Sequence, residues 1–142
     1  PWPEDLRSGL GDWYFNLRLA LQGPFVYVPE VLAQYRVHEA GMHRGFIRDG
    51  SGEKNTRRIL AEFSPLLKSN RQRRKVLISH LKELALAYFG MKMDADARRV
   101  LIEIMRRSPG VLLQRRLIGP SLASLVLGRK NYERLKTMRE SA

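Results

Sequence analysis

Apolar side chains recur at helical spacing through most of residues 53 to 142. Residues three or four positions apart lie on one face of an α-helix, and the clearest such series is Leu77, Leu81, Leu84, Ala85, Tyr88 and Phe89. Gly90 follows this series and belongs to a residue type that commonly ends helices. A helix with one apolar face buries that face against another element. The spacing therefore predicts antiparallel helices that pack on one another.

Further helices are predicted on both sides of this series. Ser64-Pro65 interrupts the apolar run from Ile59 to Leu67, and a new helix can begin there with Ser64 as its cap and proline at its first position. The other predicted helical segments begin at Asp94 or Asp96, at Val111 and at Asn131.

The charge of the chain is distributed very unevenly. The net charge is +12, yet residues 1 to 52 hold five arginines against six acidic residues, a balance of −1. Residues 53 to 142 hold 21 basic and eight acidic residues, a balance of +13. The turn-rich stretch Asp49-Gly50-Ser51-Gly52 lies where the balance changes. We therefore expect two parts, residues 1–50 and a basic helical extension over residues 51–142.

The first part is predicted to contain one helix and two short strands. The helix runs from Ser8 to about Gln22, and Tyr14 lies off its predicted buried stripe, which consists of Leu10, Trp13, Leu17, Ala20 and Leu21.

The strands are predicted at Phe25 to Val28 and at Ala33 to His38. The second segment alternates apolar with polar residues, which is the period of a half-buried strand, and this places Arg36 and His38 on one face. A helix and two strands bury little surface alone and are ordinarily completed by a larger sheet. The predicted fold class is α+β, mostly α: a small helix-plus-two-strand segment followed by antiparallel helices.

The motifs of this first part together resemble the closing segment of the catalytic domain in family 2 glycosyltransferases, which are inverting enzymes of the A-type fold. The resemblance covers residues 4 to 44 and departs at Gly11, where the family usually has Glu. It is carried by Asp12 at the start of a helix, Leu17-Arg18-Leu19, Gly23, the aromatic segment Phe25 to Pro29 and Tyr35-Arg36-Val37-His38.

The resemblance implies a parent enzyme that transfers a sugar from a nucleotide-sugar donor to a hydroxyl acceptor with inversion. The family's nucleotide-binding half, with its Asp-x-Asp metal site, would precede Pro1, so residues 1–50 would be the acceptor side of the catalytic domain. The parent would use a divalent metal, Mn or Mg. The isolated fragment is expected to carry no cofactor and to be inactive alone.

Asp12 is the candidate catalytic residue. An inverting transfer needs a carboxylate that takes the proton of the acceptor hydroxyl as the new bond forms. In the resembled family the Asp of a Glu-Asp pair does this, and Asp12 occupies the matching position. The alternative is a first-turn aspartate that is favoured by the helix dipole.

Three other residues are candidates for the same site. His38 matches a histidine that in some members of the family helps to hold the cation or the diphosphate; the alternative is a hydrogen-bonded surface histidine. Arg36 is a candidate phosphate contact, because guanidinium groups bind phosphate. Tyr14 is a candidate for stacking on an acceptor sugar.

The basic helices are also compatible with functions of other classes. The cluster Arg71, Arg73, Arg74 and Lys75 can bind an anionic membrane, bind nucleic acid phosphates or be a solvated surface. No nucleic-acid reading motif accompanies it, so nucleic acid is the less favoured partner. An interaction module for a protein partner is a further alternative, because residues 87 to 109 loosely echo a tetratricopeptide unit.

Localisation is predicted from two absences in the sequence. The chain has no cysteine, and no window approaches the roughly 18 apolar residues of a membrane span. We expect a cytoplasmic protein, peripheral on a membrane if its basic part binds lipid. The donor, the acceptor and the oligomeric state do not follow from the sequence.

Overall fold

The computed structural model describes residues 10–34 and 42–140, without the side chains of residues 42, 43, 139 and 140. Contacts divide the chain into two compact units, residues 1–66 and 67–142. The first described helices are α1 (Gly11–Ala20), α2 (Met42–Arg48) and α3 (Ser51–Phe63), followed by the 3₁₀ turn η2 (Ser64–Leu66). The second unit contains α4 (Asn70–Gly90), α5 (Asp94–Arg107), η3 (Pro109–Leu113), α6 (Arg115–Ser121), η4 (Leu122–Leu127) and α7 (Arg129–Glu140).

The predicted α+β fold is wrong: the described residues form helices and connecting segments, without a strand. The mostly helical character is confirmed. Phe25 to Val28 has no regular structure, and its side chains are 47 to 86% exposed. A strand needs a neighbour that accepts and donates its backbone hydrogen bonds, and no described segment pairs with this one. Of the second predicted strand, Tyr35 to His38 lie outside the described residues.

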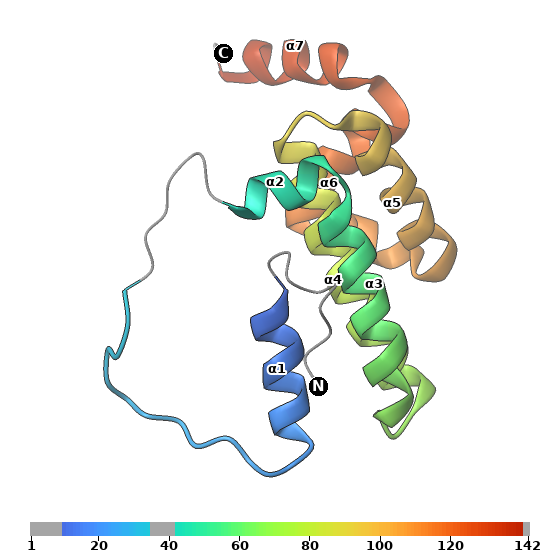
Figure 1. Cartoon of the computed structure of the whole chain (residues 1–142). Coiled ribbons are helices and arrows are strands. Elements are labelled where there is room, and N and C mark those ends of the chain that lie inside the picture. Colours follow the sequence, from blue (N-terminus) through green and yellow to red (C-terminus); the bar gives the residue numbers. More distant parts are fainter. Residues whose placement is uncertain (1–9, 35–41, 141–142) are drawn as a thin grey trace. The chain divides into compact units, whose positions relative to one another are not determined.

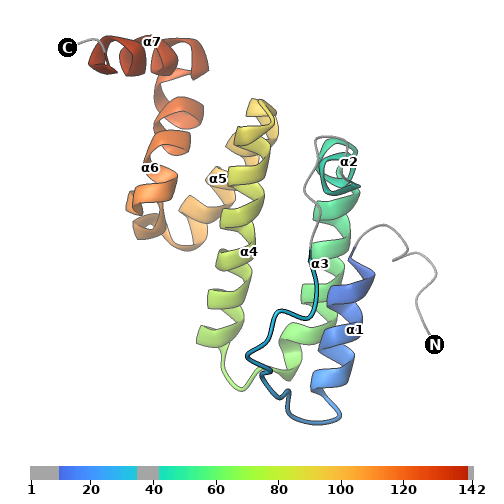
Figure 2. The same ribbon diagram turned by 90° about the vertical axis from the view of Figure 1, so that its left-hand side faces the viewer.

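The first unit has its core between α1 and α3. Figure 2 shows α1 beside α3, and the residues between them are Tyr14 and Ile59 with the partly buried Leu10, Trp13, Leu17 and Phe63. The predicted helix of residues 8–22 is shorter, since it ends at Ala20 and Ser8 lies outside the described residues. Leu10, Trp13 and Leu17 of its predicted stripe do pack against this core, but Ala20 and Leu21 are exposed and Tyr14 is buried instead.

The glycine-rich stretch around residue 50 is a tight corner inside the first unit. Gly50 has a φ of +74°, a conformation that favours glycine, and it precedes α3. Gly52 lies in the first turn of α3, and a Cβ atom there would come within 3.0 Å of the Phe46 carbonyl oxygen. The predicted division after residue 50 differs from the contact pattern, which groups α3 with α1 and α2 and divides the chain after Leu66.

In the second unit, α4 and α5 form an antiparallel hairpin around the main core. Their turn contains Lys92, whose φ is +60°, and Met93 N–H donates to the Tyr88 carbonyl at 2.9 Å. The predicted apolar face of α4 is confirmed at Leu81, Leu84, Ala85 and Tyr88, which are buried, whereas Leu77 and Phe89 are half-buried and Ile78 is buried instead. The α5 helix contributes the buried residues Ala97, Val100, Leu101 and Ile104. The α4 helix begins later than Ser64-Pro65, at Asn70, where Ser69 and Gln72 form a capping box.

The C-terminal helices attach to this hairpin through α6 and η4. Pro120 lies inside α6, and the chain widens into a π-helical turn directly after it. A proline removes one backbone donor and disturbs the preceding turn, so a change of helical pitch at this place has a local cause. Gly128, with φ +74° and ψ 148°, ends η4, and α7 turns away from α6 there in both views (Figures 1 and 2).

Candidate functional site

Asp12 lies in the first turn of α1 with an exposed side chain. Its Oδ1 accepts the backbone N–H of Trp13 at 2.7 Å. Within the described residues no ion pair engages this carboxylate. The arrangement fits a helix-start aspartate and also leaves the carboxylate accessible to a substrate hydroxyl.

Tyr14 lies in the core, so the expectation that it is available to stack on a sugar is wrong. Only 8% of Tyr14 is exposed, and its ring meets Phe63 edge to face with centroids 5.4 Å apart. Its hydroxyl donates to Glu62 Oε1 at 2.9 Å. The pKa of Tyr14 is raised, first by this hydrogen bond to a carboxylate and then by burial. Tyr14 therefore joins α1 to α3 and faces away from solvent.

Arg18 lies near the same glutamate. Its Nη1 is 3.9 Å from Glu62 Oε1, and the two side chains are 54% and 40% exposed. An exposed pair of this kind contributes about 0 to 1 kcal/mol. Arg18 thus has a carboxylate partner on α3.

Arg36 and His38 lie outside the described residues, so their place relative to Asp12 stays a prediction. Among residues 10–34 and 42–140, no group of three or more His, Asp or Glu side chains lies close enough to hold a metal ion. The divalent metal that the resemblance implies would be held mainly by residues outside this chain, so it stays a prediction, and we derive no chemical step through it.

The cluster Arg71, Arg73, Arg74 and Lys75 is exposed along the first turns of α4. Two of its members bind backbone oxygens. Arg73 donates to the Leu67 carbonyl through Nε at 3.4 Å and Nη2 at 3.3 Å, and Arg74 Nη2 donates to the carbonyl of Arg107. Arg107 is the last residue of α5, so Arg74 covers a carbonyl at a helix end. The cluster is thus partly structural, and Arg71 and Lys75 are its most suitable members for an external anion.

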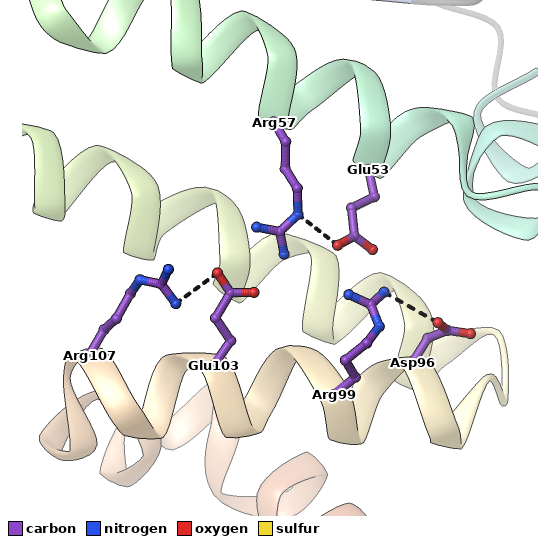
Figure 3. A network of polar contacts seen from close by, with 6 residues as sticks. All are labelled: Glu53, Arg57, Asp96, Arg99, Glu103 and Arg107. Carbon is purple, nitrogen blue, oxygen red and sulfur yellow. Dashed lines mark hydrogen bonds and ion pairs between the residues drawn. The ribbon is translucent and has the colours of Figure 1, made fainter.

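Many other charges are paired within their own helices. Figure 3 shows the pair Glu53 and Arg57 on α3 and, on α5, the pairs Asp96 with Arg99 and Glu103 with Arg107. The shortest nitrogen–oxygen distances of these pairs are 2.8, 3.3 and 2.8 Å, respectively.

An open hollow on α5 is lined in part by four arginines of this helix. Arg98 Nε donates to the Ser124 carbonyl at 2.6 Å, while Arg99 and Arg107 take part in the pairs above. Arg106 is the fourth arginine. Three of these four arginines therefore contact other groups of the protein. The number of positive side chains in the second unit is thus larger than the number available to bind an external anion.

The structure adds a surface to which the sequence analysis assigned no role. Ile118, Leu122 and Val126 of α6 and η4 are 43%, 41% and 71% exposed. The apolar residues at these positions could have indicated this surface, because the segment 117–127 is apolar on more than one side of a helix.

No protein-family model, curated protein or solved structure matches this chain. In the part of the chain that the structure describes, no helix combines the length and the apolar character needed to cross a bilayer.

Proposed function

We propose that this chain is the C-terminal part of an inverting, family 2-like glycosyltransferase, with the acceptor side in residues 1–50 and Asp12 as the catalytic base. The observation that carries the proposal is the exposed Asp12 carboxylate at the start of α1, which makes no ion pair within the described residues. A general base must reach the hydroxyl that it deprotonates, and an accessible carboxylate at a helix start meets that requirement.

A second feature supports the proposal that a larger body covers this part of the chain. The segment that follows α1 exposes large apolar side chains: Val26, Tyr27, Val31 and Leu32 are 73 to 90% exposed. Several neighbouring apolar side chains in water are unfavourable and commonly mark a surface that another body covers. In the proposed enzyme, the nucleotide-binding half is that body.

The chemistry assigned to this chain is a single proton transfer. The acceptor oxygen bonds to the anomeric carbon of the donor while the bond from that carbon to the leaving diphosphate breaks, and Asp12 takes the hydroxyl proton. His38 and Arg36 are proposed to contact the metal or the diphosphate. The Mn or Mg ion itself would be held mainly by residues outside this chain.

The proposal is tested by Asp12→Asn in the full-length protein that contains this chain. Turnover should fall about 10²- to 10⁴-fold, which is the usual contribution of a positioned base. Release of nucleoside diphosphate from a panel of uridine and guanosine diphosphate sugars measures it.

Asp49→Asn is the matched control. Asp49 Oδ1 accepts the Ser51 N–H at 2.8 Å before α3, so the same substitution removes the same kind of helix-start carboxylate. Turnover of Asp12→Asn within a few-fold of the Asp49→Asn control would reduce Asp12 to a structural residue.

A second candidate function is favoured by the exposed Arg71 and Lys75 on α4. We propose that the basic helices hold the protein at an anionic membrane surface in the cytoplasm. Each Lys or Arg near such a surface contributes about 1 kcal/mol, and salt weakens the attraction. Sedimentation with vesicles of phosphatidylglycerol, compared with phosphatidylcholine, tests this. Tight binding to a random DNA duplex that survives moderate salt would favour the nucleic acid alternative.

A further inference from the structure

The segment formed by α6 and η4 is apolar on two sides. Its inner side is buried in the second unit, with Leu117, Pro120 and Ala123 among the buried residues. Its outer side carries Ile118, Leu122 and Val126, which are 43%, 41% and 71% exposed. A helix that packs only on its own domain needs one apolar side, so the second side calls for a further apolar contact.

The three outer residues lie along one line. They are four positions apart, and residues at this spacing are neighbours on a helix surface. The step from Ile118 to Leu122 is slightly more than one α-helical turn, and the step from Leu122 to Val126 is slightly less than one turn of the wider π-helix. The two small rotations are opposite in sense, so the three residues stay on one side. Figure 2 shows α6 continuing into the following turn as one rod, with α7 crossing its far end. We call Ile118, Leu122 and Val126 the outer face of α6–η4.

Basic residues lie at both ends of the outer face. Arg115 is exposed three positions before Ile118, and Lys130 is exposed just beyond η4. Residues 111 to 142 contain seven basic and two acidic residues, a balance of +5. An apolar stripe with basic residues beside it is the pattern of segments that lie in the interface of an anionic bilayer.

We infer that the outer face of α6–η4 inserts shallowly into the headgroup region of an anionic lipid surface. This deepens the membrane proposal above, but it rests on a different surface from the α4 cluster. A lipid surface fits better than a second copy of the chain, because a second copy would bring the same positive charge. Three partly exposed side chains also supply far less than the roughly 1,200 Å² that specific protein interfaces bury. Insertion into lipid requires no such area and no shape complementarity.

The test replaces the apolar line in the full chain by Ile118→Gln, Leu122→Gln and Val126→Gln together. Binding to vesicles of mixed phosphatidylcholine and phosphatidylglycerol should weaken by about tenfold or more, because these side chains no longer leave water on binding. The control is Leu21→Gln, Leu66→Gln and Met105→Gln, at apolar residues that are 52%, 59% and 43% exposed. The control should bind as the parent does, and circular dichroism should show equal helicity in all three proteins.

A second measurement reports insertion directly. Leu122→Trp should show fluorescence that shifts to shorter wavelength with anionic vesicles and is quenched by bromine-labelled acyl chains. Met105→Trp is the matched control and should show neither change.

Three outcomes would overturn the inference. The first is equal vesicle binding by the outer-face variant and its control. The second is loss of binding only on Arg71→Glu with Lys75→Glu, which would leave the α4 cluster as the membrane surface. The third is a mass in solution that doubles for the parent and not for the outer-face variant, which would assign the face to a second copy of the chain.

Discussion

The hydroxyl of Tyr14 donates a hydrogen bond to Glu62 Oε1 across 2.9 Å and so links α1 to α3. The two residues are 48 positions apart in the sequence. The link lies beside the Tyr14 and Phe63 ring contact, so polar and apolar interactions hold the same pair of helices.

Tyr14→Phe should destabilise the protein by about 1 kcal/mol, measured by urea unfolding followed by circular dichroism. The ring stays in the core, but Glu62 loses its donor. A hydrogen bond to a charged group can contribute more. Because Glu62 is 40% exposed, however, water can hydrogen-bond to its carboxylate in the variant and offset part of the lost stability. Tyr27→Phe is the matched control, because Tyr27 is 86% exposed, and it should change the stability by less than about 0.5 kcal/mol. Equal effects of the two substitutions would show that the Tyr14 hydroxyl contributes nothing.

Tyr14 also shows why the buried face of α1 could be predicted only in part from the sequence. Leu10, Trp13, Tyr14 and Leu17 are all large and apolar or aromatic, so several rotations of the helix give a continuous stripe. The rotation is decided by Glu62 and Phe63, which lie far along the chain. The spacing of Leu81, Leu84 and Tyr88 in α4 indicates one helical face from the sequence alone, and these three residues are buried.

The strand prediction failed for a related reason. Phe25 to Val28 has the composition of a strand, but strand formation depends on a partner that local sequence does not reveal. The candidate site shares this limit. Asp12 could be placed at a helix start from its neighbours alone, whereas its relation to Arg36 and His38 depends on residues outside the described part of the chain.

Ser69→Ala should destabilise α4 by about 1 kcal/mol, because it removes one of the two reciprocal hydrogen bonds that cap the start of this helix. Ser69 Oγ accepts the Gln72 N–H at 3.2 Å, and Gln72 Oε1 accepts the Ser69 N–H at 3.2 Å. Ser79→Ala, at an exposed position within α4, makes the same atomic change without a cap. It should be neutral or slightly stabilising, since alanine is the better helix former. Chemical denaturation of both variants measures the difference, and a Ser79→Ala loss as large as that of Ser69→Ala would contradict the capping role.

Arg129→Lys should destabilise the protein by about 2 kcal/mol. Arg129 lies at the start of α7 and contacts both carboxylate oxygens of Asp94 at 2.6 to 2.9 Å. It also donates to the Phe89 carbonyl at 2.7 Å, and its guanidinium carbon is 4.1 Å from the centre of the Phe89 ring. Lysine retains the charge but not the planar fork that makes these contacts together.

Hydrogen exchange locates the effect of Arg129→Lys. The backbone amides of α7 should exchange faster, because the substitution loosens the attachment of this helix to the α4–α5 turn. Arg134→Lys is the control on the same helix, at an exposed position, and should leave exchange unchanged. Unaltered α7 exchange in Arg129→Lys would show that other contacts hold the helix.

His80 should make the protein less stable in mild acid. Burial in α4 lowers the pKa of His80 below its ordinary value of 6.5, and the nearby Glu83 carboxylate opposes this shift only in part. The unfolded chain therefore binds a proton at His80 more readily than the folded chain does. As the pH falls through about 6.5, protonation favours the unfolded state, and the free energy of unfolding decreases until the lower folded pKa is passed.

His80→Gln removes this linkage, so urea unfolding from about pH 7.5 to about pH 5.5 should show a smaller loss of stability in the variant than in the parent. His38 and His43 are present in both proteins, so their titration cancels in the comparison unless it depends on His80. Parallel pH profiles for parent and variant would mean that His80 has the same proton affinity in the folded and unfolded chains.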